Sequence, residues 1–249
     1  MTRQNLHIFL LFLIFFLSVY QIVANEKIYI EREELSPSVA IYLSGGGARG
    51  ISQIGVLQGL ESENIPIDYI AGTSMGGVIG GLFASGYKTD EIIDIIINEE
   101  WQALSELIPE YERNNLTLDQ KYIKDKSFFS FKFQNFNFLP PEGISYGKEY
   151  YGILQSTLYS APFKSNNNYN NLFIPLRIAA TDLTTGSTKY FDKGNIINVI
   201  RASATFPLLY TPVKMDSSIY IDGGMFANIP IKAPFNHEPD IKIAVDNTS

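Results

Sequence analysis

A serine between two glycines is the residue of this chain with the clearest chemical potential. Gly72-Thr-Ser-Met-Gly76 fits the pattern Gly-x-Ser-x-Gly and stands between an apolar run and a stretch of small and apolar residues. In this motif a strand turns sharply into a helix and lifts the serine hydroxyl clear of the sheet. N–H groups at the start of that helix favour an oxyanion. We therefore predict that Ser74 is a nucleophile and that the Met75 N–H contributes to an oxyanion hole.

A glycine-rich stretch precedes this motif, and we call Gly45–Gly50 the glycine loop. It fits the Gly-x-Gly-x-x-Gly fingerprint of dinucleotide sites, but no acidic residue for a ribose ends the following strand-like run, and no P-loop lysine follows the glycines. Consecutive glycines also present backbone N–H groups to a tetrahedral intermediate, as in the glycine-rich motifs of lipases. We favour this second use, with Gly45, Gly46 and Gly47 as oxyanion donors.

A serine nucleophile needs a proton acceptor, and the chain offers few candidates. Asp222 ends an apolar run and is followed by two glycines, which predicts a carboxylate at the edge of the sheet where ligands bind in open α/β folds. A triad in which Asp182 or Asp222 is followed by His237 is also formally possible. His237 lies in a polar segment bounded by prolines, which is typical of an exposed connection. The residues favour a dyad of Ser74 and Asp222 and leave the triad open.

Strand-like and helix-like runs alternate around these residues. Strand, glycine turn and helix occur twice in succession, at 38–60 and 65–84, which predicts a parallel sheet with crossover helices. In the first unit we expect Ile51, Ile54, Val56, Leu57 and Leu60 to cover one helix face. Further helices are expected at 89–96, 101–107, 146–159 and 195–202, and further strands at 174–180, 189–191, 218–221 and 241–245. Phenylalanines between 128 and 138 alternate largely with polar residues and predict a hairpin with one aromatic face. This face either contacts lipid or packs into the core of the domain.

Composition limits the partners and cofactors of the chain. Its 249 residues contain no linker-like stretch, and 45% hydrophobic with 18% charged residues is typical of a packed globular domain. The formal charge is −7 and no run of Lys or Arg occurs, so we expect no nucleic-acid partner. The absence of cysteine and the presence of only two histidines argue against thiolate or histidine metal sites. We expect neither a metal nor another cofactor.

The N-terminal segment resembles a secretory signal peptide. A weakly basic start, an apolar run at 8–19 and a small residue at the end predict a signal at 1–24, followed by a lead-in at 25–37 and one domain at 38–249. The alternative is an uncleaved anchor, because the run approaches the roughly 17 residues that begin to span a bilayer. Both predict export to the periplasm, the outer membrane or the medium. The chain stops soon after the last predicted strand, so we expect it to be part of a longer protein.

These segments together resemble the patatin-like phospholipase family. Five segments carry the resemblance, in the order and spacing of the family: 45–50, 72–76, 180–186, 202–207 and 222–224. The similarity extends from about residue 39 to about residue 245. It implies a lipid acyl hydrolase with a three-layer α/β/α fold, a nucleophile elbow and a Ser-Asp dyad that needs neither metal nor histidine.

The resemblance also implies roles for single residues. Ser74 corresponds to the nucleophile, Asp222 to the proton acceptor and the first three glycines of the glycine loop to the oxyanion donors. The residues that support these motifs are Arg49, Gly50, Gly72, Gly76, Gly223 and Gly224. The implied substrate is a lipid or phospholipid at a membrane surface. The leader and the abrupt end are similar to bacterial proteins in which such a domain precedes an outer-membrane barrel. The alternatives are a catalytically silent lipid- or nucleotide-binding module and an esterase that uses His237.

Overall fold

The computed structural model describes residues 37–98, 132–134, 137–139, 145 and 147–247. The strands are β1 (Val39–Leu43), β2 (Tyr69–Thr73), β3 (Lys132–Gln134), β4 (Asn137–Leu139), β5 (Leu176–Asp182), β6 (Ser187–Phe191), β7 (Val213–Met215), β8 (Ser218–Asp222) and β9 (Ile241–Val245). The α-helices are α2 (Gln53–Ser62), α3 (Met75–Ala84), α4 (Thr89–Asn98), α7 (Lys148–Ser160) and α8 (Ile196–Ser203), and the 3-10 helices are η1 (Gly47–Ser52), η3 (Tyr169–Asn171) and η4 (Gly223–Met225). The predicted leader and the helix expected at 101–107 lie outside the described residues.

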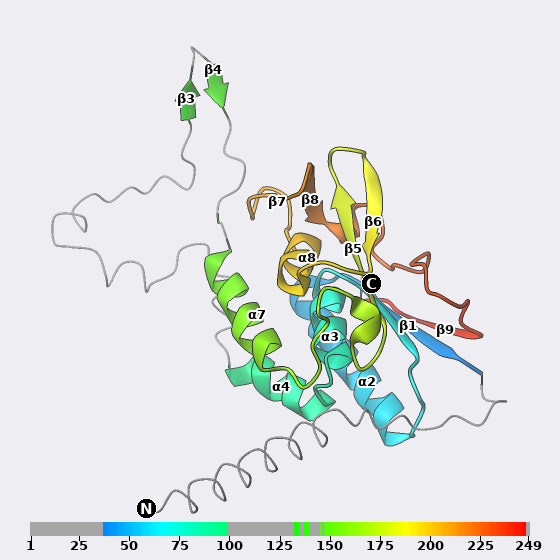
Figure 1. The fold of residues 1–249 in the computed structure, drawn as a ribbon. Helices are drawn as coiled ribbons and strands as arrows, with labels where there is room; N and C mark the ends of the chain where they lie inside the picture. The colour runs from blue at the N-terminus through cyan, green and yellow to red at the C-terminus, as the bar shows by residue number, and fades with distance from the viewer. Residues whose placement is uncertain (1–36, 99–131, 135–136, 140–144, 146, 248–249) are drawn as a thin grey trace, which may run out of the picture. The chain divides into compact units, whose positions relative to one another are not determined.

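One mixed sheet carries most of these strands (Figure 1). Its order is β7-β8-β5-β2-β1-β9, with β6 also paired to β5. β5, β2, β1 and β9 are parallel, whereas β6, β8 and β7 pair antiparallel with their neighbours. The predicted parallel sheet is therefore confirmed for the half that carries both glycine turns. β9 reaches this half from the far end of the sequence and covers the outer edge of β1.

β2 and β8 lie one after the other along the same edge of β5. Ala179 pairs with Thr73 of β2, and the next residue, Ala180, pairs with Asp222 of β8. Both alanines also pair with β6, which therefore occupies the opposite edge. β2 runs parallel to β5 and β8 runs antiparallel to it, so the carboxyl ends of β2 and β8 meet head-on. This topology places the residue after β2 beside the last residue of β8.

The two faces of the sheet pack against different layers. Along β1, Ile41 and Leu43 face one large core, and Tyr42 between them faces a second, as the period of two in a strand requires. The large core includes buried residues of α2, α3, α4, α7 and α8, which gather on one side of the sheet in Figure 1. On the other side Tyr42 packs edge-on against Phe235, with ring centroids 6.3 Å apart. In the described part of the chain this second layer is the irregular segment that follows η4.

The helix after the glycine loop differs in detail from the expectation. It begins as the 3-10 helix η1 before it continues as α2. Ile54 and Leu57 are buried as predicted, but Ile51 and Val56 are exposed. The predicted single face was wrong for Val56, because two residues along an α-helix correspond to a rotation of about 200°. Ile51 belongs to η1 and faces the pocket described below.

The predicted aromatic hairpin is present in its central part. β3 and β4 pair antiparallel, with Lys132 opposite Leu139 and Phe133 opposite Phe138. The other residues of the predicted hairpin lie outside the described residues. The proposed contact of its phenylalanines with lipid stays a prediction.

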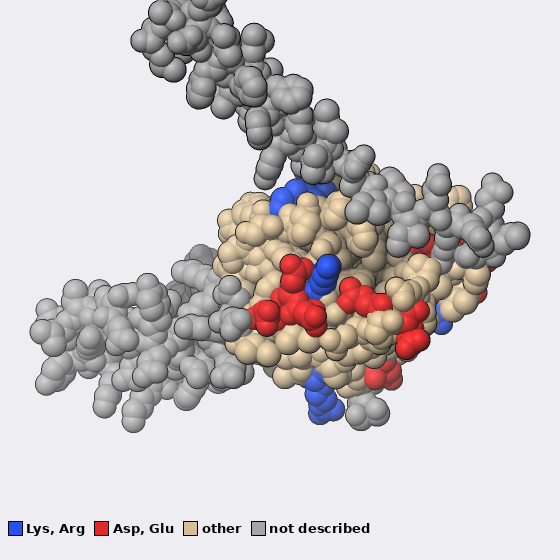
Figure 2. Space-filling view, turned by 90° about the horizontal axis from the view of Figure 1, so that it is seen from below, with Lys and Arg blue, Asp and Glu red and all other residues tan. Residues whose placement is uncertain are grey.

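Acidic side chains gather on one face of the molecule (Figure 2). The exposed acidic residues on α2, its C-cap and α4 are Glu61, Glu63, Asp90, Glu91 and Asp94. A face of this kind repels a polyanion, in line with the net charge of −7. Among the helices that the structure describes, none has the length and apolar character needed to cross a bilayer.

Candidate active site

Ser74 stands on a strained turn between β2 and α3. Its φ of 53° and ψ of −121° are rarely adopted by a residue with a side chain, and such positions cost on the order of 1–3 kcal/mol. The Ser74 N–H donates to Ser203 Oγ at 2.8 Å, and Ser203 Oγ donates to the Ala179 carbonyl at 2.6 Å. Ser203 is fully buried at the end of α8. The elbow expected from the sequence is thus present, and a hydroxyl from outside the motif holds it.

The glycines of the elbow allow very close backbone contacts. A Cβ at Gly72 would lie 2.3 Å from the Gly76 carbonyl oxygen, and a Cβ at Gly76 would lie 2.4 Å from the Leu43 oxygen. A Cβ at Gly223, which follows Asp222, would lie 2.3 Å from the Ala179 oxygen. A Cβ within 3 Å of a backbone atom forces the backbone to shift, which is costly. A side chain at Gly72 or Gly76 would displace α3 from β2 or β1, and one at Gly223 would displace η4 from β5.

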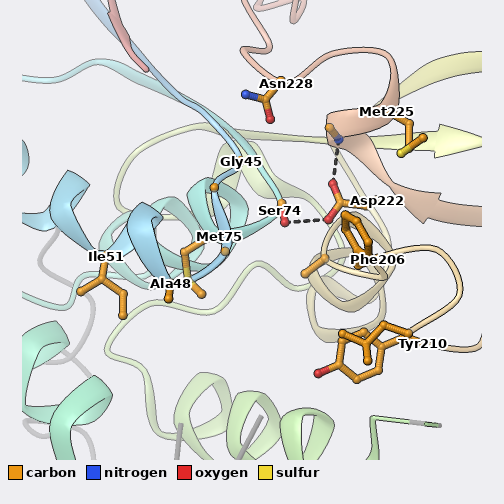
Figure 3. A pocket seen from close by; sticks show the side chains of 15 residues that line it. Gly45, Ala48, Ile51, Ser74, Met75, Phe206, Tyr210, Asp222, Met225 and Asn228 are labelled. Atoms are coloured by element: carbon orange, nitrogen blue, oxygen red, sulfur yellow. Dashed lines mark hydrogen bonds between the residues drawn. The ribbon is translucent and has the colours of Figure 1, made fainter. Parts of the chain in front are cut away.

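The Asp222 carboxylate accepts two hydrogen bonds at the end of β8 (Figure 3). Ser74 Oγ donates to Oδ2 at 2.7 Å, and the Gly224 N–H donates to Oδ1 at 2.7 Å. The Asp222 N–H donates to the Thr205 carbonyl at 2.8 Å. Burial raises the pKa of Asp222, and the hydrogen bonds from Gly224 and Ser74 only partly offset that effect. A carboxylate with a raised pKa in contact with a hydroxyl is suited to accept its proton.

The glycine loop lies beside this pair, but its first N–H is already used. The Gly45 N–H donates to the Asn228 carbonyl at 3.1 Å, so the prediction that it serves as an oxyanion donor needs correction. Gly47 is the first residue of η1 and Met75 is the first residue of α3, and the first N–H groups of a helix have no partner within the helix. Gly46, Gly47 and Met75 therefore remain as candidate donors.

The remaining predicted residues differ in how they support the site. A Cβ at Gly50 would lie 2.6 Å from Met75 Cγ, and a Cβ at Gly224 would lie 3.0 Å from Asp222 Oδ1, so both glycines leave space for site residues. Arg49 is exposed in η1, and its side chain is not part of the pocket lining. The Arg49 carbonyl accepts a bond from Ser52 Oγ at 2.8 Å, and the expected supporting role of the arginine side chain stays a prediction.

A pocket of about 570 Å³ opens over the Ser74–Asp222 pair. The residues that line it are Gly45, Gly46, Gly47, Ala48, Ile51, Ser74, Met75, Ala204, Phe206, Leu209, Tyr210, Asp222, Gly224, Met225 and Asn228. In Figure 3 Ala48, Ile51 and Met75 lie on one side of the pair, and Phe206 and Tyr210 lie on the other. Most of the lining side chains are apolar. Among the described residues, His, Asp and Glu side chains form no group of three that could hold a metal ion.

The residues of the alternative triad lie elsewhere. His237 is exposed and does not line the pocket. Asp182 is not part of the lining either, and its carboxylate accepts the N–H groups of Thr184 and Thr185 at 2.8 and 3.4 Å in the turn between β5 and β6. The structure therefore brings Ser74 to Asp222 and not to His237.

Three residues that support the site were not predicted from the sequence. Ser203 and Thr205 hold the backbone N–H groups of Ser74 and Asp222, respectively, and Asn228 holds that of Gly45. The stretch 202–207 was noticed as similar to a family segment, but its residue types alone indicate no role. Asn228 carried no signal, because an asparagine six residues after a strand is ordinarily a surface residue.

A model of the patatin-like phospholipase family matches residues 41–235. The chain belongs to the patatin-like phospholipase family. The match includes the glycine loop, the elbow and Asp222, which confirms the resemblance noted from the sequence.

Several known proteins are similar to this patatin-like chain. Lysophospholipase NTE1 of Kluyveromyces lactis is 27% identical over 232 residues, which cover 90% of this chain and 14% of that protein. An uncharacterised NTE family protein of Mycobacterium tuberculosis is 29% identical over 214 residues, covering 86% of this chain and 50% of that protein. The chain thus spans half or less of the length of these relatives.

The fold is also similar to a solved structure. The crystal structure of VipD from Legionella pneumophila superimposes with a TM-score of 0.53 at 19% identity, covering 84% of this chain and 49% of that one. This similarity supports the patatin-like α/β fold with its mixed, mostly parallel sheet.

Proposed function

We propose that this chain is a lipid acyl hydrolase of the phospholipase A or esterase type. It cleaves carboxylic esters with Ser74 as nucleophile and Asp222 as general base. The observation that carries the proposal is the 2.7 Å hydrogen bond from Ser74 Oγ to Asp222 Oδ2 at the base of an apolar pocket. This distance lies within hydrogen-bond reach, about 2.6–3.2 Å, over which a general base takes a proton directly. The lysophospholipase name of the yeast relative supports a lipid ester as substrate.

In the first half-reaction Ser74 Oγ attacks the ester carbonyl carbon while its proton passes to Asp222 Oδ2. The carbonyl oxygen becomes an oxyanion that the N–H groups of Gly46, Gly47 and Met75 stabilise. The tetrahedral intermediate then collapses, the bond to the alcohol oxygen breaks, and Asp222 returns its proton to that oxygen. The alcohol leaves and the acyl group stays on Ser74.

In the second half-reaction a water molecule attacks the acyl-enzyme. Asp222 takes a proton from the water as its oxygen bonds to the acyl carbon, and the same N–H groups hold the second oxyanion. Collapse breaks the bond to Ser74 Oγ, which recovers the proton from Asp222. The fatty acid leaves, and both residues return to their starting protonation states.

Apolar side chains around the pocket mouth favour a lipid over a soluble ester. Phe206 and Met225 line the pocket and are largely exposed, and their neighbours Leu208 and Phe226 are exposed as well. Leu208 has a φ of 69°, a conformation that carries strain for a residue with a side chain. We call these four residues the apolar rim. An exposed apolar surface that continues into a pocket is suited to contact a lipid aggregate.

The proposed chemistry is tested by labelling the chain with a fluorophosphonate and by hydrolysis of a p-nitrophenyl ester and a lysophospholipid. Wild type should label and hydrolyse, Ser74→Ala should do neither, and His237→Ala should match wild type. If His237→Ala abolishes activity as Ser74→Ala does, the triad replaces the dyad. If folded wild type neither labels nor hydrolyses any ester, the chain is a silent binding module.

The pH dependence of kcat/KM should report Asp222. The carboxylate must be ionised to accept the serine proton, and burial raises its pKa above the ordinary 3.8. Activity on a neutral ester is therefore expected to be full above this raised pKa and to fall as the pH is lowered through it. The profile is measured on a short-chain ester over a range in which thermal unfolding shows the chain folded. An acid limb at or below 3.8 would contradict Asp222 as the buried base.

The apolar rim should matter for aggregated substrate alone. Leu208→Ser removes a leucine that is 78% exposed beside the pocket, whereas Leu183→Ser changes one that is 50% exposed in the turn between β5 and β6. We expect Leu208→Ser to lower binding to phosphatidylcholine vesicles and hydrolysis of vesicle lipid, and to leave hydrolysis of a soluble short-chain ester unchanged. Leu183→Ser should change neither. Equal vesicle binding by both variants would remove the rim from the proposal.

We also propose that the chain is exported, on the basis of the signal-like pattern at 1–24. N-terminal sequencing of the protein from cell fractions tests this. A mature protein that begins near Asn25 outside the cytoplasm would support cleavage, and an intact leader in the membrane fraction would support an anchor.

A further inference from the structure

Asn247, which lies just after β9, bridges the two ends of the glycine loop. Its N–H donates to Ser44 Oγ at 3.1 Å, and its side-chain Nδ2 lies 3.3 Å from the same oxygen. Ser52 Oγ donates to Asn247 Oδ1 at 3.0 Å. Ser44 immediately precedes the loop and Ser52 follows it by two residues. Asn247 lies outside the residues 41–235 that match the family model.

The glycine loop needs contacts of this kind because four of its six residues are glycines and the side chains of the other two, Ala48 and Arg49, are exposed. Glycine loses more conformational freedom on folding than any other residue, and Gly47 is held at a φ of 54°. An oxyanion hole nevertheless stabilises a transition state only when its N–H groups are already aimed at the oxygen. The loop must therefore be positioned from outside.

The loop is held between two asparagines from distant parts of the chain. On the pocket side the Asn228 carbonyl accepts the Gly45 N–H at 3.1 Å. On the opposite side Gly46 lies against Asn247, since a Cβ at Gly46 would be 3.3 Å from Asn247 Cβ. Gln53 Nε2 also donates to the Ser44 carbonyl at 3.0 Å, but this bond fixes only the start of the loop. Asn247 contacts Ser44 just before the loop, Gly46 within it and Ser52 at the end of η1.

We propose that Asn247 is a positioning residue for the oxyanion hole, which it serves by holding the Gly46 and Gly47 N–H groups in place. This inference rests on the proposed hydrolase function. Because those N–H groups meet a full negative charge only in the transition state, loosening them should lower kcat and leave KM close to the wild-type value. Misplacement by about 1 Å costs up to about 10²-fold in rate.

The experiment compares the full chain with Asn247→Ala, Ser52→Ala and the double variant. It measures kcat and KM on a short-chain ester, the affinity for a trifluoromethyl ketone that forms a tetrahedral adduct with a serine, and Tm. For Asn247→Ala we expect kcat and adduct affinity to fall by the same factor while KM stays unchanged. The double variant should be no worse than Asn247→Ala, because both changes break one bridge. Asn168→Ala is the control, because Asn168 Oδ1 accepts the Asn170 N–H at 3.1 Å at the start of η3. This variant should lower Tm and leave kcat unchanged.

Two results would overturn the inference. One is unchanged kcat and adduct affinity in folded Asn247→Ala, and the other is a loss that follows only the fraction of unfolded protein and that Asn168→Ala reproduces. A wild-type chain that neither hydrolyses esters nor binds the ketone would instead remove the proposed function, and this inference with it. An active wild type with a neutral Asn247→Ala removes this inference alone.

Discussion

Asp222→Asn is expected to abolish most hydrolysis while leaving the chain at least as stable as wild type. The amide oxygen can still accept the Gly224 N–H and the amide nitrogen can donate to Ser74 Oγ, so the local hydrogen bonds survive. An amide cannot take the serine proton, and loss of a general base lowers kcat by about 10²–10⁴-fold. Since burial raises the pKa of Asp222, the ionised carboxylate destabilises the fold above that pKa, and a neutral amide relieves this.

Asp182→Asn is the matched control, and it should show the opposite pattern. Burial raises the pKa of Asp182. Hydrogen bonds from Thr184, Ser218 and Thr185 together lower it by more than burial raises it, so the net pKa lies below its ordinary value. The ionised form therefore stabilises the fold above the unfolded-state pKa, and that stability is lost as the pH falls through the folded-state value. At pH 7 Asp182→Asn should lower Tm and keep activity.

Ester hydrolysis and thermal unfolding at pH 7 measure both effects on the same samples. Loss of activity with loss of stability in Asp222→Asn would indicate a structural carboxylate in place of a base. Loss of activity in Asp182→Asn would reopen the triad that uses Asp182 and His237.

The local elements of this site could be predicted because each depends on neighbouring residues. A strand that ends in Gly-x-Ser-x-Gly, and a strand that ends in Asp-Gly-Gly, carry their turn signals within a few positions. The close contacts of Gly72 and Gly76 explain why the sequence pattern predicts the turn, since only glycine fits between those backbone atoms. The Ser74–Asp222 pairing was predicted, but from a parallel sheet whose strands end at one carboxyl edge. β8 is in fact antiparallel to β5, and Asp222 reaches Ser74 because the ends of β2 and β8 meet head-on along β5.

The contacts that hold the site could not be predicted because they join segments far apart in the sequence. β2 and β8 share one edge of β5, an arrangement that neither strand encodes alone. Ser203 is 129 residues from Ser74, and a serine near the end of an amphipathic helix gives no sign that its hydroxyl accepts a distant N–H. The predicted donor role of Gly45 failed for the same reason, because its partner Asn228 is 183 positions away. Arg49 matched a pattern but projects to solvent.

Ser203→Ala is expected to impair both stability and catalysis. The change removes the acceptor of the Ser74 N–H and the donor to the Ala179 carbonyl, and it leaves two buried backbone groups without these partners. Each unsatisfied buried group costs about 1–3 kcal/mol, and the strained Ser74 conformation loses a contact that maintains it. Displacement of the Ser74 hydroxyl that follows should lower kcat by up to about 10²-fold.

Ser85→Ala separates loss of a buried hydroxyl from loss of positioning. Ser85 is as buried as Ser203, but its Oγ donates to the Gly81 carbonyl at 2.7 Å, which also accepts the Ser85 N–H, at the end of α3 far from the elbow. Its removal should lower Tm slightly and leave kcat unchanged. Chemical denaturation, together with the rate of fluorophosphonate labelling at Ser74, measures the two effects separately. Equal labelling rates in both folded variants would mean that the elbow keeps its geometry without Ser203, and that β2 and α3 alone hold the nucleophile in place.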